Sequence, residues 1–191
     1  MSNQSIRKLT TAIAATLLSG AIVFGAAPAG QSSPTDPSLT TTLTTTLHEL
    51  RLSHHLAPVL TDDRLVRAAQ LKARAMLTEG NFEHTLADGR TPWDFMRAAG
   101  YRYELAGENL AMDFSNPNDI TQAWLASPSH RDTMLDPTFV DVGIASATGD
   151  FHGHQTTIVV ELFGRPDPAS PIERALARLT YRLENVIMND R

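Results

Sequence analysis

The sequence contains no cysteine among its 191 residues. Disulfide bonds and thiolate metal sites are therefore excluded, and any metal ion would have to be held by histidine, aspartate or glutamate. A chain of this length is long enough for one domain with a substantial apolar core. We therefore expect a domain that its core stabilises without covalent cross-links.

Clustered basic residues are also missing. The chain has 16 lysines and arginines against 21 aspartates and glutamates, a formal net charge of −5, and no basic stripe. Because phosphate backbones are bound by clustered Lys and Arg, we expect no nucleic-acid partner. A Gly-rich phosphate loop and a Gly-x-Ser-x-Gly nucleophile motif are absent as well, so neither of these motif classes explains the chain.

Residues 1–29 have the features of a secretory signal peptide. Arg7 and Lys8 give a basic start, residues 9–24 are mostly apolar, and residues 27–29 (Ala-Pro-Ala) supply the small side chains of a cleavage site. An uncleaved membrane anchor is the alternative, but a spanning helix needs about 20 apolar residues, and this run is shorter and interrupted by threonine and serine. We predict cleavage before Gly30 and a secreted or periplasmic mature protein.

The mature chain begins with a polar segment, residues 30–38, that we expect to be disordered. Apolar periodicity and capping residues then predict helices over 40–54 and 62–79, the second capped by Thr61 or Asp62 and closed by Gly80. Shorter helices should start at Asn116-Pro117 and at Thr91-Pro92, where Asp94 completes a capping box. Residues 141–147 and 155–163 are predicted to form two strands, and the apolar run at residues 158–160 indicates a strand covered on both faces. Lys72 interrupts the apolar face of the second helix, and we expect its side chain to extend outward to water.

Residues 166–191 differ from the rest of the chain. A proline-containing linker is followed, within 172–187, by apolar residues at spacings of four and three, which predicts an amphipathic helix. The apolar positions are Ile172, Leu176, Leu179, Leu183 and Val186. The stripe is about two heptads long, which is short for an independent coiled coil. Docking on its own domain is favoured, and self-association through 172–187 is the alternative.

Three short motifs place polar side chains beside apolar anchors. Glu108 lies in Gly107–Ala111, His84 follows Phe82-Glu83, and His130 follows Ser127-Pro128-Ser129. We expect each of them at a turn or just past a helix end, where a side chain can point into a groove. Two imidazoles and one carboxylate match a three-ligand zinc site with an open position. The alternative is that Glu108 only orients the imidazoles by hydrogen bonds.

Taken together, the motifs resemble the CAP superfamily, which comprises cysteine-rich secretory proteins, antigen 5 and pathogenesis-related proteins, and especially its disulfide-free bacterial SCP-like extracellular domains. The likeness covers residues 39–165. The matching segments are Leu50-Arg51, Leu56-Ala57-Pro58, Phe82-Glu83-His84, Asp88-Gly89, Ala99-Gly100-Tyr101, Gly107-Glu108-Asn109-Leu110-Ala111, Trp124, Ser127-Pro128-Ser129-His130-Arg131, Val142-Gly143-Ile144 and Phe163-Gly164. The resemblance implies an α+β fold, a three-layer α-β-α sandwich with a small antiparallel sheet. It also implies a cleft shared by His84, Glu108 and His130.

The sequence departs from the family pattern in ways that bear on chemistry. Animal members carry a further glutamate three residues after the helix tryptophan, and that position is Ser127 here. His48, Thr133 and Glu161 stand where asparagine, asparagine and glutamine are usual. The missing glutamate leaves three polar groups instead of four, which puts a family-wide hydrolytic mechanism in doubt.

The favoured function is a non-catalytic exported binding module for a divalent ion such as zinc, a small ligand or a lipid. One alternative is an endopeptidase-like hydrolase, either metal-dependent or with Glu108 polarising a histidine as general base. Another is an envelope interaction protein that acts through the C-terminal helix. His152 and His154 alternate in the predicted hairpin and share a face that suits a metal, but a solvated loop tip is the favoured interpretation.

Overall fold

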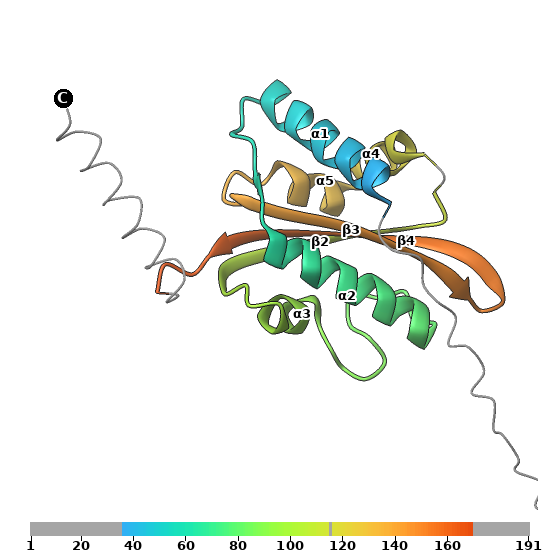
Figure 1. Ribbon diagram of the computed structural model, residues 1–191. Coiled ribbons are helices and arrows are strands. Elements are labelled where there is room, and N and C mark those ends of the chain that lie inside the picture. Colours follow the sequence, from blue (N-terminus) through green and yellow to red (C-terminus); the bar gives the residue numbers. More distant parts are fainter. Residues whose placement is uncertain (1–35, 115, 170–191) are drawn as a thin grey trace, which may run out of the picture.

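The computed structural model describes residues 36–114 and 116–169 (Figure 1). Its elements in chain order are α1 (Pro37–Ser53), β1 (Leu60–Thr61), α2 (Asp63–Glu79), α3 (Pro92–Ala98), β2 (Tyr103–Met112), α4 (Pro117–Ala126), α5 (Pro128–Leu135), β3 (Asp141–Phe151) and β4 (His154–Pro166). The predicted signal peptide 1–29 and the predicted C-terminal helix 172–187 lie outside the described residues. None of the helices in the described ranges is long and apolar enough to span a bilayer.

The sheet has four strands in the order β1-β3-β4-β2. The pairs β3–β4 and β4–β2 are antiparallel, whereas the two residues of β1 run parallel to the start of β3. Ile158, Val159 and Val160 in the central strand β4 are all at most 1% exposed. This confirms that the apolar run belongs to a strand covered on both faces. Both predicted strands were too short, since β3 continues to Phe151 and β4 to Pro166.

Helices cover both faces of the sheet, which confirms the three-layer α-β-α sandwich. Figure 1 shows α1, α4 and α5 on one face and α2 with α3 on the other. Each face has its own apolar cluster. Leu65, Met76 and Met96 belong to the cluster under α2 and α3, and Leu47 and Trp124 to the one under α1 and α4.

The helix boundaries follow local chemistry. Asp36 caps α1 by accepting hydrogen bonds from the backbone N–H groups of Ser38 and Leu39, so the helix begins at Pro37 inside the predicted leader. Asp62 caps α2 and Gly80 ends it with a φ of 60°, as predicted. The Thr91–Asp94 capping box of α3 is also confirmed.

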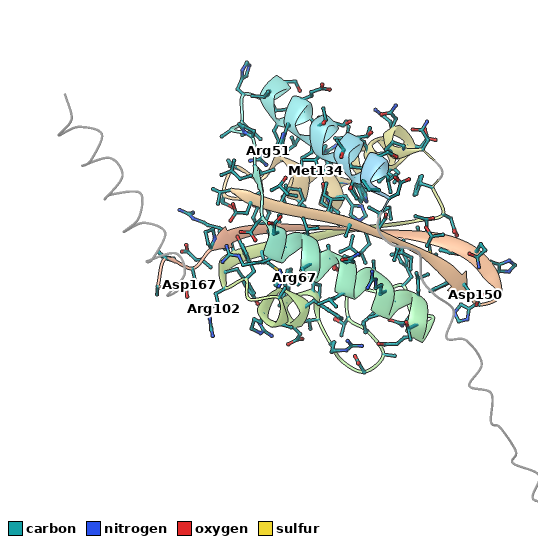
Figure 2. The ribbon with its side chains drawn as sticks, in the orientation of Figure 1. Arg51, Arg67, Arg102, Met134, Asp150 and Asp167 are labelled. Carbon is teal, nitrogen blue, oxygen red and sulfur yellow. The ribbon has the colours of Figure 1, made fainter. Side chains whose placement is uncertain are left out.

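Helix α5 was not predicted, because it is only eight residues long and buries one side chain, Met134. It is held to α1 by Arg51, which is 1% exposed (Figure 2). Nη1 of Arg51 donates to the carbonyls of Met134 (2.8 Å) and Asp136 (3.0 Å), and its Nε donates to that of Ala57 (2.9 Å). One buried guanidinium therefore fixes the segment that carries His130.

The described chain extends slightly past the predicted domain end at residue 165. The backbone N–H of Asp167 donates to the carbonyl of Arg102 at 3.0 Å (Figure 2). Gly143 of β3 lies very close to α2, because a Cβ there would be 2.2 Å from the carbonyl carbon of Leu65. Because Gly143 has no side chain, α2 can pack directly against β3 at this position.

Candidate functional site

Glu108 is a buried carboxylate near the middle of β2, a strand at the edge of the sheet. Its side chain is 2% exposed. Oε1 is 2.6 Å from Nδ1 of His84 and 3.1 Å from Nζ of Lys72, and Oε2 is 3.0 Å from the same Nζ. The expectation that all three site residues lie at turns or past helix ends was therefore wrong. Glu108 lies within a strand and His130 within α5, and only His84 lies in a loop.

The expectation that the Lys72 side chain extends outward to water was also wrong. Its side chain is 0% exposed and does not extend to water. The ammonium turns inward, where it donates to Oε1 of Glu108 and to the backbone carbonyl of His84. Burial lowers the pKa of Lys72, and the Glu108 carboxylate partly offsets that effect. The missed signal was its position on the apolar face of α2, since a lysine buried there needs a countercharge.

His84 presents one ring nitrogen to the carboxylate and the other to the surroundings. Nδ1 faces Glu108, so this nitrogen is the donor and Nε2 is left with the lone pair in the neutral ring. The side chain is 60% exposed. The hydrogen bond to Glu108 raises the pKa of His84, because it stabilises the imidazolium form. A carboxylate that fixes one imidazole nitrogen orients the other toward a ligand.

His130 belongs to α5, which lies on the other face of the sheet from α2 (Figure 1). It lies in the first turn of α5, half-buried, and its carbonyl accepts a hydrogen bond from Nδ2 of Asn109 at 3.3 Å. Burial lowers the pKa of His130, and the charge of His84 lowers it further. Successive residues of a strand point to opposite faces. Glu108 therefore binds His84 on the α2 face of β2, and Asn109 binds the His130 carbonyl of α5 on the opposite face. Glu108 and His84 therefore meet on the α2 face of β2, whereas the segment that carries His130 is held from the opposite face.

A second buried carboxyl supports the strand that carries the site. Glu161 in β4 lies opposite Asn109 in the β2–β4 register, and its Oε2 accepts a hydrogen bond from Asn109 Nδ2 at 2.9 Å. Complete burial raises the pKa of Glu161 to about 8, although the bond from Asn109 acts in the opposite direction. The side chain is therefore mainly protonated at neutral pH and behaves like the glutamine usual at this position.

Metal binding by His84, Glu108 and His130 stays a prediction, and two features of the described chain count against Glu108 as a third ligand. No group of three or more His, Cys, Asp or Glu side chains that could hold a metal ion is present within residues 36–114 and 116–169. Both oxygens of Glu108 lie against the Lys72 ammonium, which would repel a divalent cation. Only the two imidazoles remain as candidate ligands of a metal.

The histidines of the hairpin belong to no group of three or more His, Cys, Asp or Glu side chains in the described chain that could hold a metal ion. His152 and Gly153 form the tip between β3 and β4, as the loop-tip interpretation predicted. Nε2 of His152 is 2.9 Å from the carbonyl of Gly80, the residue that ends α2. This ring therefore holds the hairpin against α2.

Comparison with known proteins gives the family. Residues 45–163 match the sequence profile of CAP, the cysteine-rich secretory protein family. The YkwD protein of Bacillus subtilis is 32% identical over 94 residues, which are 49% of this chain and 37% of that protein. The chain thus spans just over a third of this curated relative.

Solved structures agree with the fold. An outer surface protein of Borrelia burgdorferi is 26% identical with a TM-score of 0.62, over 71% of this chain and 99% of that one. An extracellular SCP-domain protein of Bacillus anthracis is 23% identical with a TM-score of 0.58, over 67% of this chain and 40% of that one. With more than half of its length matched by the family profile, the chain belongs to the cysteine-rich secretory protein (CAP) family.

Proposed function

We propose that the protein is an exported binding module that holds a small ligand between His84 and His130, and that the ligand carries an oxyanion such as a carboxylate. Export is supported by the signal-peptide features of residues 1–29. It is also supported by two similar solved structures, one of an outer surface protein and the other of an extracellular protein.

The observation that carries the proposal is the ion pair between Lys72 and Glu108. It cancels the carboxylate's charge, so the cleft is not an anionic site. Glu108 at the same time raises the pKa of His84, so this ring carries a proton over a wider pH range than a free histidine. An imidazolium beside a second imidazole attracts an oxyanion through charge-assisted hydrogen bonds.

A general-base hydrolase is the second candidate, and the His84–Glu108 hydrogen bond favours it. A carboxylate that binds Nδ1 leaves Nε2 free to accept a proton from water or a hydroxyl group. Turnover of a protein substrate such as casein that is lost in both His84→Ala and His130→Ala would support this function. Lipid binding and self-association through 172–187 stay predictions.

Calorimetry with two probes tests the binding function. Sodium acetate should bind more tightly at about pH 5.5 than at about pH 7.5, because protonation of imidazole favours an anion. Zinc chloride should show the opposite trend if the two imidazoles bind a metal, since metal binding requires neutral rings. Acetate binding should be lost in His84→Ala and in His130→Ala.

His54→Ala is the matched control, because His54 is an exposed histidine at the end of α1. It should leave both titrations unchanged. Binding of neither probe, or equal binding in the wild type and both cleft variants, would reject the proposed function. Zinc binding without acetate binding would replace the oxyanion with a metal held by the two imidazoles.

A further inference from the structure

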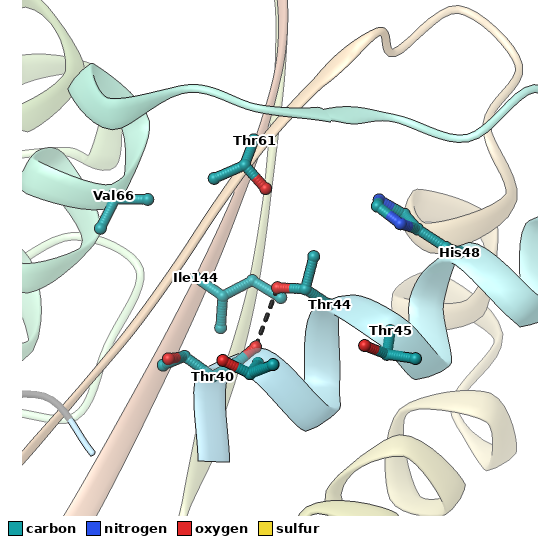
Figure 3. A pocket seen from close by; sticks show the side chains of 8 residues that line it. Thr40, Thr44, Thr45, His48, Thr61, Val66 and Ile144 are labelled. Carbon is teal, nitrogen blue, oxygen red and sulfur yellow. Dashed lines mark hydrogen bonds between the residues drawn. The ribbon is translucent and has the colours of Figure 1, made fainter. Parts of the chain in front are cut away.

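A second hollow lies at the edge of the sheet opposite the His84 cleft. It is formed by α1, by β1 and by the first turns of α2, with one residue of β3 at its floor, and has a volume of about 420 Å³ (Figure 3). Because β1 and β2 are the two outer strands, the two sites lie at opposite edges. The volume falls within the range of about 300–1,000 Å³ that is typical of small-ligand sites.

The lining is unusually rich in hydroxyl groups. Five threonines contribute to it, four from α1 and one from β1: Thr40, Thr41, Thr44, Thr45 and Thr61. Two of them, Thr40 and Thr44, donate to backbone carbonyls of α1 and its cap and keep only acceptor capacity. The hydroxyls of Thr41, Thr45 and Thr61 make no hydrogen bond with any residue that the structure describes, so each is free both to donate and to accept.

One residue that lines this pocket has a ring nitrogen without a hydrogen-bond partner among the described residues. Nε2 of His48 is buried from water and has no hydrogen-bond partner among the described residues. Figure 3 shows the ring extending from α1 toward the space that Thr44 and Thr61 also face. Buried polar atoms in native proteins are nearly always satisfied. A group that enters the pocket can bond to Nε2 once the His48 ring turns toward the pocket, and that bond would remove this deficit.

The remaining lining is apolar and uncharged. Val66 of α2 and Ile144 of β3 complete the wall, and the threonine methyl groups add further apolar surface. No lysine, arginine, aspartate or glutamate of the described chain lines the pocket. A charged ligand would therefore lose its hydration without gaining a countercharge.

We propose that this threonine-lined pocket is a second binding site of the protein, for a neutral saccharide. Sugar hydroxyls both donate and accept hydrogen bonds, which matches free threonine hydroxyls and an unpartnered imidazole nitrogen. The C–H faces of a sugar ring are apolar and match the isoleucine, the valine and the threonine methyl groups. The site is separate from the His84 cleft and needs none of its residues.

The test follows the imidazole C–H signal of His48 by NMR, assigned through its disappearance in His48→Phe. Maltose and N-acetylglucosamine are added as neutral probes, with sodium glucuronate as a charged probe of similar size. We expect a saturable shift with at least one neutral sugar and none with glucuronate. Thr45→Val and Thr61→Val should each weaken binding about tenfold, the upper range for one lost hydrogen bond.

Thr42→Val is the matched control. Thr42 is an exposed threonine of α1 that does not line the pocket, and its hydroxyl donates to the carbonyl of Ser38. This variant and His84→Ala should bind the neutral sugar as the wild type does, which separates this site from the proposed cleft function. The proposal is overturned if neither sugar gives a saturable shift, if both pocket variants bind like Thr42→Val, or if glucuronate binds equally well.

Discussion

Nζ of Lys72 lies 3.0 Å from Oε2 of Glu108, and the two side chains are only 0% and 2% exposed. The carboxylate at the centre of the candidate cleft is thus paired within the protein before any ligand arrives. The pair joins α2 to β2, and the same carboxylate orients His84. Its removal should therefore affect both the stability of the fold and the protonation of the cleft.

Replacement of Lys72 by methionine should lower the free energy of unfolding by about 3–5 kcal/mol, because the buried Glu108 charge loses its ammonium partner and keeps only the hydrogen bond to His84. Urea denaturation at neutral pH measures the loss. Arg74→Met is the control, since Arg74 is exposed on the same helix. The double variant Lys72→Met/Glu108→Leu should recover much of the stability. A loss in Lys72→Met no larger than in Arg74→Met would show that the pair contributes little.

The two cleft histidines should titrate on opposite sides of the ordinary histidine pKa of 6.5. NMR should find His84 above it, because of the hydrogen bond to Glu108, and His130 below it, because of burial and the charge of His84. Glu108→Gln should lower the midpoint of His84. The His84–Glu108 bond contributes its full stabilisation below the pKa that His84 has in the unfolded chain. This stabilisation is lost as the pH rises through the higher pKa of His84 in the folded protein. Titration in the reverse order would contradict the described geometry.

Glu161→Gln should stabilise the protein more at pH 8 than at pH 5. The folded wild type keeps the Glu161 proton up to a pKa of about 8, whereas the unfolded chain releases it near 4.5. The unfolded state therefore binds fewer protons between these values, and wild-type stability falls as pH rises through this window. A glutamine cannot ionise, so its advantage should reach roughly 2–4 kcal/mol at pH 8. If urea denaturation gave the same difference in unfolding free energy between Glu161→Gln and the wild type at pH 5 and at pH 8, this account would be refuted.

Gly143→Ala should destabilise the fold by more than about 3 kcal/mol or prevent folding, because the new methyl group would meet backbone atoms of Leu65 and Val66 within 2.3 Å. Gly89→Ala is the comparison. Gly89 has open space around it and a φ of 87°, so that substitution carries only left-handed strain of about 1–2 kcal/mol. Thermal unfolding of the two variants decides, and equal melting temperatures would show that α2 can move away from β3.

Local signals in the sequence predicted much of the framework. Asp62 and Gly80 marked the ends of α2, and the Ile158–Val160 run marked a strand buried on both faces. The site was harder, because its partners lie far apart in the chain. Lys72 meets Glu108 across 36 positions and Asn109 meets Glu161 across 52. Strand β2 was not predicted, because polar residues occupy some of its buried positions. The sequence of β2 therefore lacks the alternation of apolar and polar residues that indicates a strand.

The strand order has a consequence for when this protein can fold during its synthesis. β4 is the last described strand to be made, yet it lies between β3 and β2, and β2 pairs with no other strand of the described chain. A nascent chain that ends before His154 lacks β4, with which β2 pairs in the described chain, although α2 and Lys72 have already been made. Domains that depend on such distant pairings fold slowly and late. The cleft should therefore form only after nearly the whole domain has left the ribosome.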